Sequence, residues 1–136
     1  MRPGRFQEFV IDLAKNDPGV TRVQTLAEEG ETKVPCGLAI TLGQRVSRWG
    51  VVGQLPDGAK HEGFTDTPVH GTPCAAGEPP RPEDAPEAWL SALLGRAASP
   101  EIAHVERWST RPDARPDYRG VTVRFHNSAR VFVRLL

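Results

Sequence analysis

The sequence predicts an α+β fold in two layers, with an antiparallel sheet of about six strands and two helices on one face. Three observations lead to this fold class. The last strands show a strict apolar alternation, two segments have the apolar spacing of amphipathic helices, and the order helix–strand–strand–strand occurs twice.

The clearest pattern lies between residues 119 and 136. Val121, Val123 and Phe125 alternate with polar residues before a short turn at Asn127–Ser128. The same alternation continues after the turn at Val131, Val133 and Leu135. A period of two on both sides of a tight polar break predicts a β-hairpin with one buried face.

The first half begins with a helix predicted over residues 3–16. Its apolar residues Phe6, Phe9, Val10 and Leu13 follow the i, i+3, i+4, i+7 spacing of one helix face. Strands are predicted over 20–27, 36–42 and 46–55. Glycines 50 and 53 blur the phase of the third strand and indicate a bulge. The Pro56–Gly58 turn leaves room for a further short strand over 59–64.

The second half begins with a helix that starts at Asp84. An Asx cap at Asp84, Pro86 in the first turn and Glu87 three residues after the cap form a standard helix start. A strand over 102–108, a Pro/Asp/Arg-rich connection and the hairpin follow. Residues 65–82 are rich in Pro, Gly and Thr and predict a loop. The chain is therefore one domain, 1–136, with halves 1–64 and 83–136.

The two halves also align with each other as an internal repeat. Shifts of 80 to 83 residues superpose the helix stripes and the strands that follow them. Two such units can join at their open edges to form one six-stranded sheet with both helices on the same face. The opposite face then stays uncovered, with no sequence signal for a third layer. Its predicted residues are Thr41, Ser47, Thr122, Arg124, His126, Arg130, Phe132 and Arg134.

Composition narrows the class of protein. The formal net charge is zero, but residues 61–100 carry −4 and residues 101–136 carry +3. No apolar run approaches the roughly 20 residues of a membrane span, and no secretion signal is evident. Two cysteines do not make a disulfide framework, so the expectation is a cytoplasmic protein. The excess of arginine over lysine, with abundant Ala, Gly and Pro, indicates a GC-rich bacterial genome.

The candidate site is the uncovered face of the hairpin. Arg124, Arg130 and Arg134 surround Phe132, and His126 lies at the turn. Arginine and aromatic side chains are enriched in protein interfaces, which predicts a non-catalytic adaptor domain that binds a protein partner or a second copy of itself. The same composition suits a single-stranded nucleic-acid platform, although the zero net charge counts against that alternative. No cofactor is predicted.

Three further alternatives involve the loop. His61, His70 and Cys74 have ligand types that zinc accepts, and Cys36 could approach them from the start of its strand, but their spacing matches no zinc motif. The two cysteines could instead form a disulfide. An acid–base set of His61, Glu62 and Asp66 is possible in principle. The chain has no nucleophile elbow or phosphate-binding glycine loop, so catalysis is not predicted.

Overall fold

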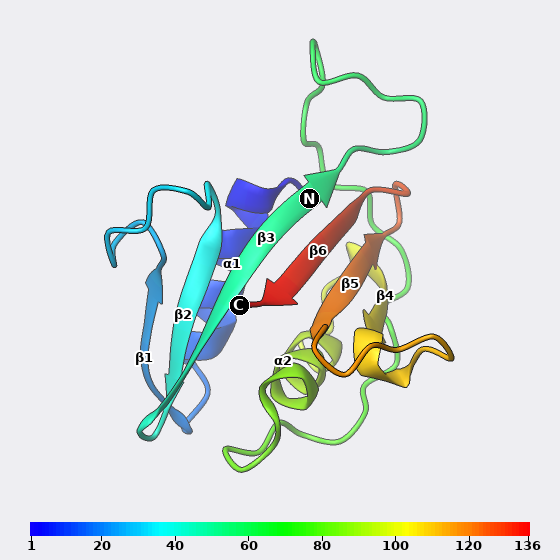
Figure 1. The fold of residues 1–136 in the computed structure, drawn as a ribbon. Coiled ribbons are helices and arrows are strands. Elements are labelled where there is room, and N and C mark those ends of the chain that lie inside the picture. Colours follow the sequence, from blue (N-terminus) through cyan, green and yellow to red (C-terminus); the bar gives the residue numbers. More distant parts are fainter.

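The computed structural model describes residues 1–136 and confirms the predicted fold class. Two helices and one six-stranded antiparallel sheet make up the chain (Figure 1). The elements are α1 (Pro3–Lys15), β1 (Val20–Thr25), β2 (Gly37–Leu42), β3 (Arg45–Gln54), α2 (Pro86–Gly95), β4 (Ile102–Arg107), a 3-10 helix (Trp108–Thr110), β5 (Gly120–Phe125) and β6 (Arg130–Leu135). Neither helix is long and apolar enough to cross a membrane.

The strands are ordered β1-β2-β3-β6-β5-β4, so each half of the chain forms one half of the sheet. The halves join where β3 pairs with β6, with Val51 opposite Val133. Both outer strands also have a register shift near their start, at Val20/Arg22 in β1 and at Ile102/His104 in β4. This symmetry is what two joined units would produce. A common origin of the halves remains a prediction.

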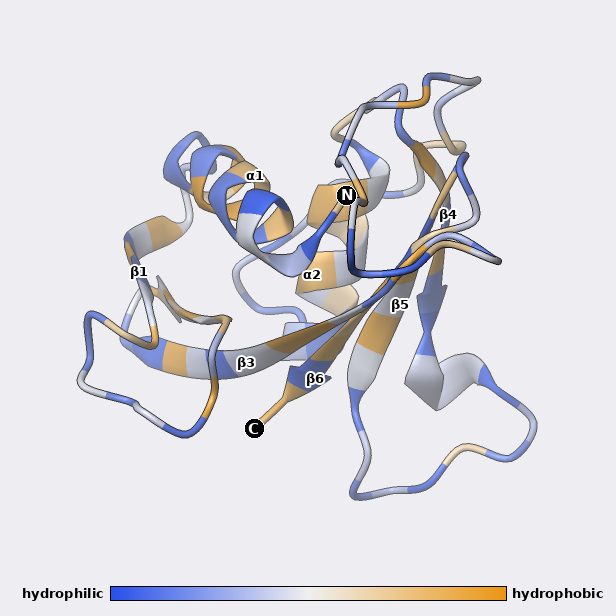
Figure 2. Cartoon of the chain, turned by 90° about the horizontal axis from the view of Figure 1, so that it is seen from above, coloured by the Kyte–Doolittle hydropathy of each residue, from blue (hydrophilic) through white to orange (hydrophobic).

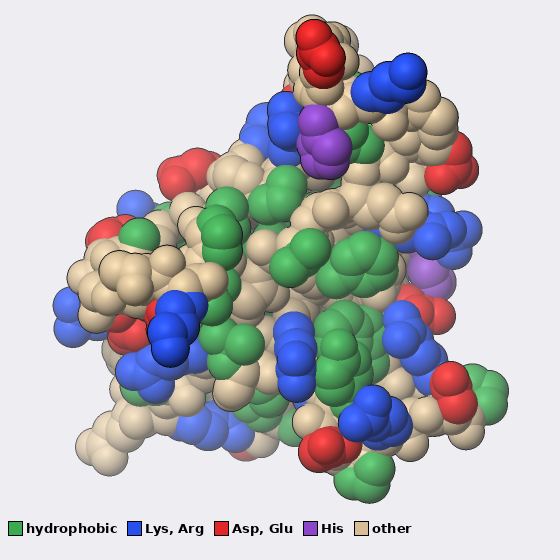
Figure 3. Space-filling model, turned by 45° about the horizontal axis from the view of Figure 1, so that its top comes forward, with side chains coloured by type: hydrophobic (Ala, Val, Ile, Leu, Met, Phe, Trp, Pro, Cys, Tyr) green, Lys and Arg blue, Asp and Glu red, His purple; other side chains and the backbone are tan.

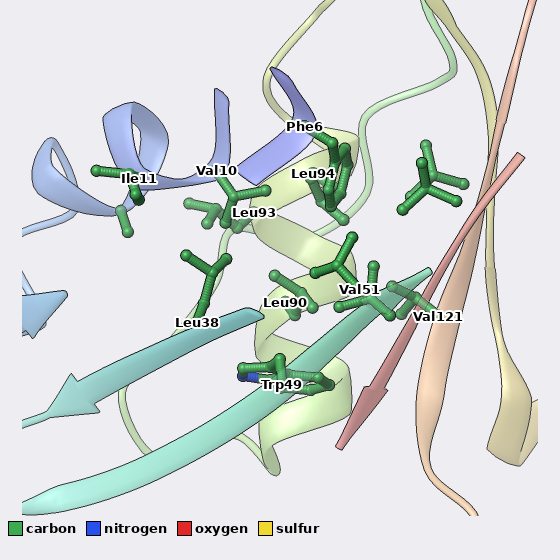
Figure 4. Packing of buried hydrophobic residues seen from close by; sticks show 14 of the residues in the cluster. Phe6, Val10, Ile11, Leu38, Trp49, Val51, Leu90, Leu93, Leu94 and Val121 are labelled. Atoms are coloured by element: carbon green, nitrogen blue, oxygen red, sulfur yellow. The ribbon is translucent and has the colours of Figure 1, made fainter. Parts of the chain in front are cut away.

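Both helices lie on the same side of the sheet (Figure 2). Their apolar stripes meet the inward residues of the strands in one continuous core, seen from close by in Figure 4. The largest side chains that this core hides completely include Phe6 of α1, Trp49 of β3, and Trp89 and Leu90 of α2. Each strand therefore has one face against the helices and one face turned away from them.

Three sequence predictions in this region are wrong. Strand β3 has a continuous register with β2 and β6, and it contains no bulge. Because the phase is unbroken, Ser47 points into the core, where its Oγ accepts a hydrogen bond of 3.0 Å from Trp49 Nε1. Residues 59–64 form no strand. Since β2 and β6 already occupy both edges of β3, a strand that follows β3 directly has no free edge to pair with.

Helix α2 begins differently from the prediction. Asp84 accepts a bond from the Arg81 amide, and no side chain caps the helix. Glu87 is instead buried and accepts bonds from the amides of Gly120 (3.0 Å) and Ser109, from Arg107 Nε (3.0 Å) and from the Ser109 hydroxyl. Burial alone raises the pKa of Glu87, but these hydrogen bonds outweigh it and hold the pKa below its usual value. The carboxylate thereby fastens α2 to β4 and β5.

Candidate functional site

The candidate site is the face of the sheet that the helices leave uncovered, which we call the open face. Figure 1 looks directly onto it. Arg124, Arg130 and Arg134 are exposed there, and Phe132 is half-buried between them. These four residues therefore lie where the sequence predicted. Strand alternation explains their placement, because each one follows or precedes a buried residue of β5 or β6.

Strand pairing arranges the open face in rows that run across the sheet. One row contains His104, Arg124, Arg130 and Gln54, each directly opposite the next. The neighbouring row contains Glu106, Thr122, Phe132 and Val52. A third row places Arg134 between Gly120 and Gly50. The arginines and Phe132 thus belong to different rows, which differ in charge.

The segment that joins β4 to β5 covers one end of the open face, contrary to the expectation of a fully bare surface. Trp108 is buried there, and its Nε1 donates to Thr122 Oγ1 at 2.9 Å. The ring of Tyr118 stacks on Trp108 with 4.9 Å between the ring centres. The guanidinium carbon of Arg134 lies 4.5 Å from the centre of the Tyr118 ring. Arg134 is therefore already engaged within the chain.

A second arginine of this segment is also engaged. Arg111 binds Glu106 through two nitrogens, the shorter contact being 2.6 Å, and it also donates to Thr122 Oγ1. Glu106 therefore has its charge matched by Arg111. Its carboxylate lies on the same face as Arg124 but forms no hydrogen bond to it.

Arg124 and Arg130 form no salt bridge with any carboxylate in the chain. They line a shallow pocket of about 240 Å³. The remaining lining residues are His104, Glu106, Arg111, Thr122 and Phe132. The pocket combines cationic groups with one aromatic wall, so it can accept an anionic group beside an apolar one.

Exposed apolar side chains continue from the pocket across the middle of the sheet. Val52 is 64% exposed and lies directly opposite Phe132, while Leu136 is 60% exposed and packs with Val34 over Gly50. Figure 3 shows apolar side chains gathered in this central area, with basic side chains among them and around them. The β1–β2 connection stands on the same side of the sheet (Figure 2).

His126 is the one predicted site residue that lies apart from the others. Its ring packs directly against Gly71, and its Nε2 is 2.9 Å from the carbonyl oxygen of Thr72. The loop over 65–82 therefore holds this side chain. The β5–β6 turn is the point at which that loop contacts the hairpin.

The structure does not assemble the alternative sites of the loop. No group of three or more His, Cys, Asp or Glu side chains is placed to hold a metal ion. His61 borders a cavity beside Phe64, whereas Cys74 lies near Gly95 of α2, and Cys36 and Cys74 are both free.

Arg5 donates two hydrogen bonds of 3.0 Å to the Asp66 carboxylate. These bonds lower the pKa of Asp66 to about 2, although partial burial acts to raise it. A carboxylate of that kind stays ionised at neutral pH and is a poor acid–base group.

Sequence reasoning missed several members of the site. Alternation around Val105 places His104 and Glu106 on the open face, so the β4 sequence contained that signal. No local pattern indicates that Arg111 and Tyr118 fold back over the sheet. No family model, curated protein or solved structure matches this chain, so its function has to be inferred from the geometry of this face.

Proposed function

We propose that the protein is a non-catalytic binding domain that docks a protein partner on the open face of its sheet. The observation that carries the proposal is the continuous surface formed by the Arg124–Arg130 pair, half-buried Phe132 and exposed Val52. An apolar centre with arginine and an aromatic side chain is the composition of protein interfaces.

Internal contacts hold two polar groups of this face in place. Arg111 binds Glu106, and the Thr122 hydroxyl accepts a hydrogen bond from Trp108. These contacts fix the shape of the surface at one end. A surface held in one shape loses little conformational entropy when a partner binds.

The aromatic side chains favour a protein over a nucleic acid. Stacking of bases requires aromatic rings with a free face. Tyr118 already stacks on Trp108 and is contacted by Arg134 and Arg115, so Phe132 is the remaining aromatic ring at the centre of the face. One half-buried phenyl ring offers little for base stacking but is a common anchor for an apolar side chain of a protein.

Position-specific photo-crosslinking tests this function. A benzophenone amino acid replaces Val52 on the open face or, as the control, Glu8 on the exposed side of α1. The expected result is a crosslinked polypeptide, identified by mass spectrometry, that forms from position 52 and not from position 8. Phe132→Ala and Arg130→Glu should each reduce its yield.

Equal crosslinking at both positions, or none from position 52, would contradict the proposal. A crosslink between two copies of this chain would identify the partner as a second copy. In that case sedimentation velocity should show an oligomer that dissociates on dilution and is weakened by the same two substitutions.

A further inference from the structure

The cationic row of the open face has an electrostatic cost within the isolated chain. Arg124 lies directly opposite Arg130, and His104 lies opposite Arg124 on the other side. Like charges directly opposite each other on one face of an antiparallel pair are destabilising. The two arginines nevertheless form no salt bridge within the chain. An anion from outside the chain would remove this repulsion.

The charge of the pocket can be counted from its lining. Arg111, Arg124 and Arg130 contribute three positive charges, and Glu106 contributes one negative charge that Arg111 already binds. Two positive charges therefore remain without a partner, both at one end of the pocket. Guanidinium groups bind a carboxylate through paired hydrogen bonds, so two adjacent arginines can hold one acidic side chain from both sides.

The apolar pair of Phe132 and Val52 lies next to this anion site at a defined spacing. Phe132 follows Arg130 by two residues on β6, and Val52 lies directly opposite Phe132. Two residues of a strand span roughly 7 Å. Within an extended ligand, an acidic residue and an apolar residue that are separated by one residue have the same spacing and point to the same side.

We propose that the partner presents an extended segment with an acidic residue, one spacer residue and an apolar residue. The carboxylate enters between Arg124 and Arg130, and the apolar side chain packs on Phe132 and Val52. This inference rests on the proposed function of the open face and specifies the chemistry of its partner.

The number of free cations explains why the ligand is an acidic peptide rather than a nucleic acid. A nucleic acid presents a long series of phosphates, and its affinity comes from many cationic contacts along the backbone. Here Glu106 matches the charge of Arg111, and Arg134 lies outside the pocket, over the Tyr118 ring. The pocket therefore matches one acidic group and not a charged strand.

Titration of the ¹⁵N-labelled protein with three short peptides tests the inference by NMR. Ac-Ser-Glu-Ser-Leu-Ser-NH₂ should shift the side-chain Nε–Hε signals of Arg124 and Arg130 and the amide of Phe132. The peptide with Gln in place of Glu should bind about tenfold more weakly, because it cannot form charge-assisted bonds. Ac-Ser-Glu-Leu-Ser-Ser-NH₂, with the two side chains on opposite sides, should also bind more weakly.

Arg130→Gln should reduce the affinity for the first peptide about as much as the Gln peptide does. The matched control is Arg22→Gln, because Arg22 is exposed on β1 of the same sheet and lies opposite Thr41 rather than another arginine. Arg22→Gln should leave the affinity unchanged.

Equal binding of the Glu and Gln peptides would overturn the inference, as would tighter binding of a thymidine oligonucleotide to the same residues. No binding of any peptide would also reject an acidic partner. The crosslink from position 52 distinguishes the two proposals, since its presence without peptide binding rejects only the acidic ligand. Its absence rejects the docking function as well.

Discussion

The two faces of the sheet differ in whether their charged side chains have partners within the chain. On the covered face, Glu87 is buried with both carboxylate oxygens hydrogen-bonded by Gly120, Ser109 and Arg107. On the open face, Arg124 and Arg130 lie opposite each other without an acidic partner. Burying an unpaired charge costs several kcal/mol, whereas water screens an exposed one. Unmatched charge is therefore tolerated only where it is also accessible to a partner.

The largest expected difference between the faces concerns Trp49 and Val52, which lie on opposite sides of β3. Trp49→Ala should lower the free energy of unfolding by about 3–5 kcal/mol, because it removes a fully buried indole. Val52→Ala should change it by no more than about 0.5 kcal/mol, because Val52 is 64% exposed. Urea denaturation followed by far-UV circular dichroism measures both. Similar losses for the two variants would mean that the open face is covered.

The buried carboxylate gives the next largest effect. Glu87→Gln should lower the free energy of unfolding by about 2 kcal/mol, because the amide cannot accept all the hydrogen bonds and leaves Arg107 without its counter-charge. The same denaturation experiment measures it. Glu8→Gln, on the exposed side of α1, is the control and should have almost no effect. A neutral result for Glu87→Gln would show that its hydrogen bonds contribute nothing net to the fold.

The ion cluster between α1 and the loop is partly exposed and should have an intermediate effect. Arg5 binds both Asp66 and Glu101, and the pKa of Asp66 is lowered from 3.8 to about 2. Because the pKa of Asp66 is lower in the folded state, its ionised carboxylate stabilises the fold at a pH above the unfolded-state pKa. This contribution to stability is lost as the pH falls through the folded-state pKa.

Asp66→Asn should therefore cost about 1 kcal/mol at neutral pH, after allowance for solvent screening, and little at pH 2. Denaturation midpoints between pH 2 and pH 7 measure this dependence. If the midpoints of the variant and of the natural protein change in parallel over that pH range, the role given to the Arg5 contact is contradicted. Asp57→Asn, at an exposed turn, is the control.

The smallest effects distinguish the two kinds of arginine on the open face. Arg124→Thr should raise the free energy of unfolding by about 0.5 kcal/mol at low salt, because it removes a like-charge pair. Arg134→Thr should lower it by about the same amount, because it removes the contact with Tyr118. Arg22→Thr is the control for strand propensity. If both Arg124 and Arg134 variants lose stability equally, the Arg124–Arg130 pair is not strained in the free protein.

Much of the sheet was predictable because strand alternation is a local signal. Val121, Val123, Val131 and Val133 are all buried as expected, and their neighbours Arg124 and Arg130 are therefore exposed. The open edges that each half would otherwise leave also predicted a single six-stranded sheet. These inferences depend only on residue type and a period of two.

The wrong predictions all depend on partners that are distant in the sequence. The phase of Ser47 was ambiguous until pairing with β2 and β6 set it. Glu87 matches a helix-capping pattern, yet Gly120, 33 residues further along the chain, provides one of its hydrogen bonds. The prediction of a strand over 59–64 failed because no free sheet edge is adjacent to β3.

The sequence by itself determined which residues of each strand are buried and which arginines can reach the surface. Only the tertiary structure decided which of those arginines remain available. Arg134 and Arg111 are engaged by Tyr118 and Glu106, while Arg124 and Arg130 are left facing each other. The physical reason is the separation along the chain of the residues involved. Burial follows from the local periodicity of the sequence, whereas the pairing of charges depends on which distant segments the fold brings within a few ångströms.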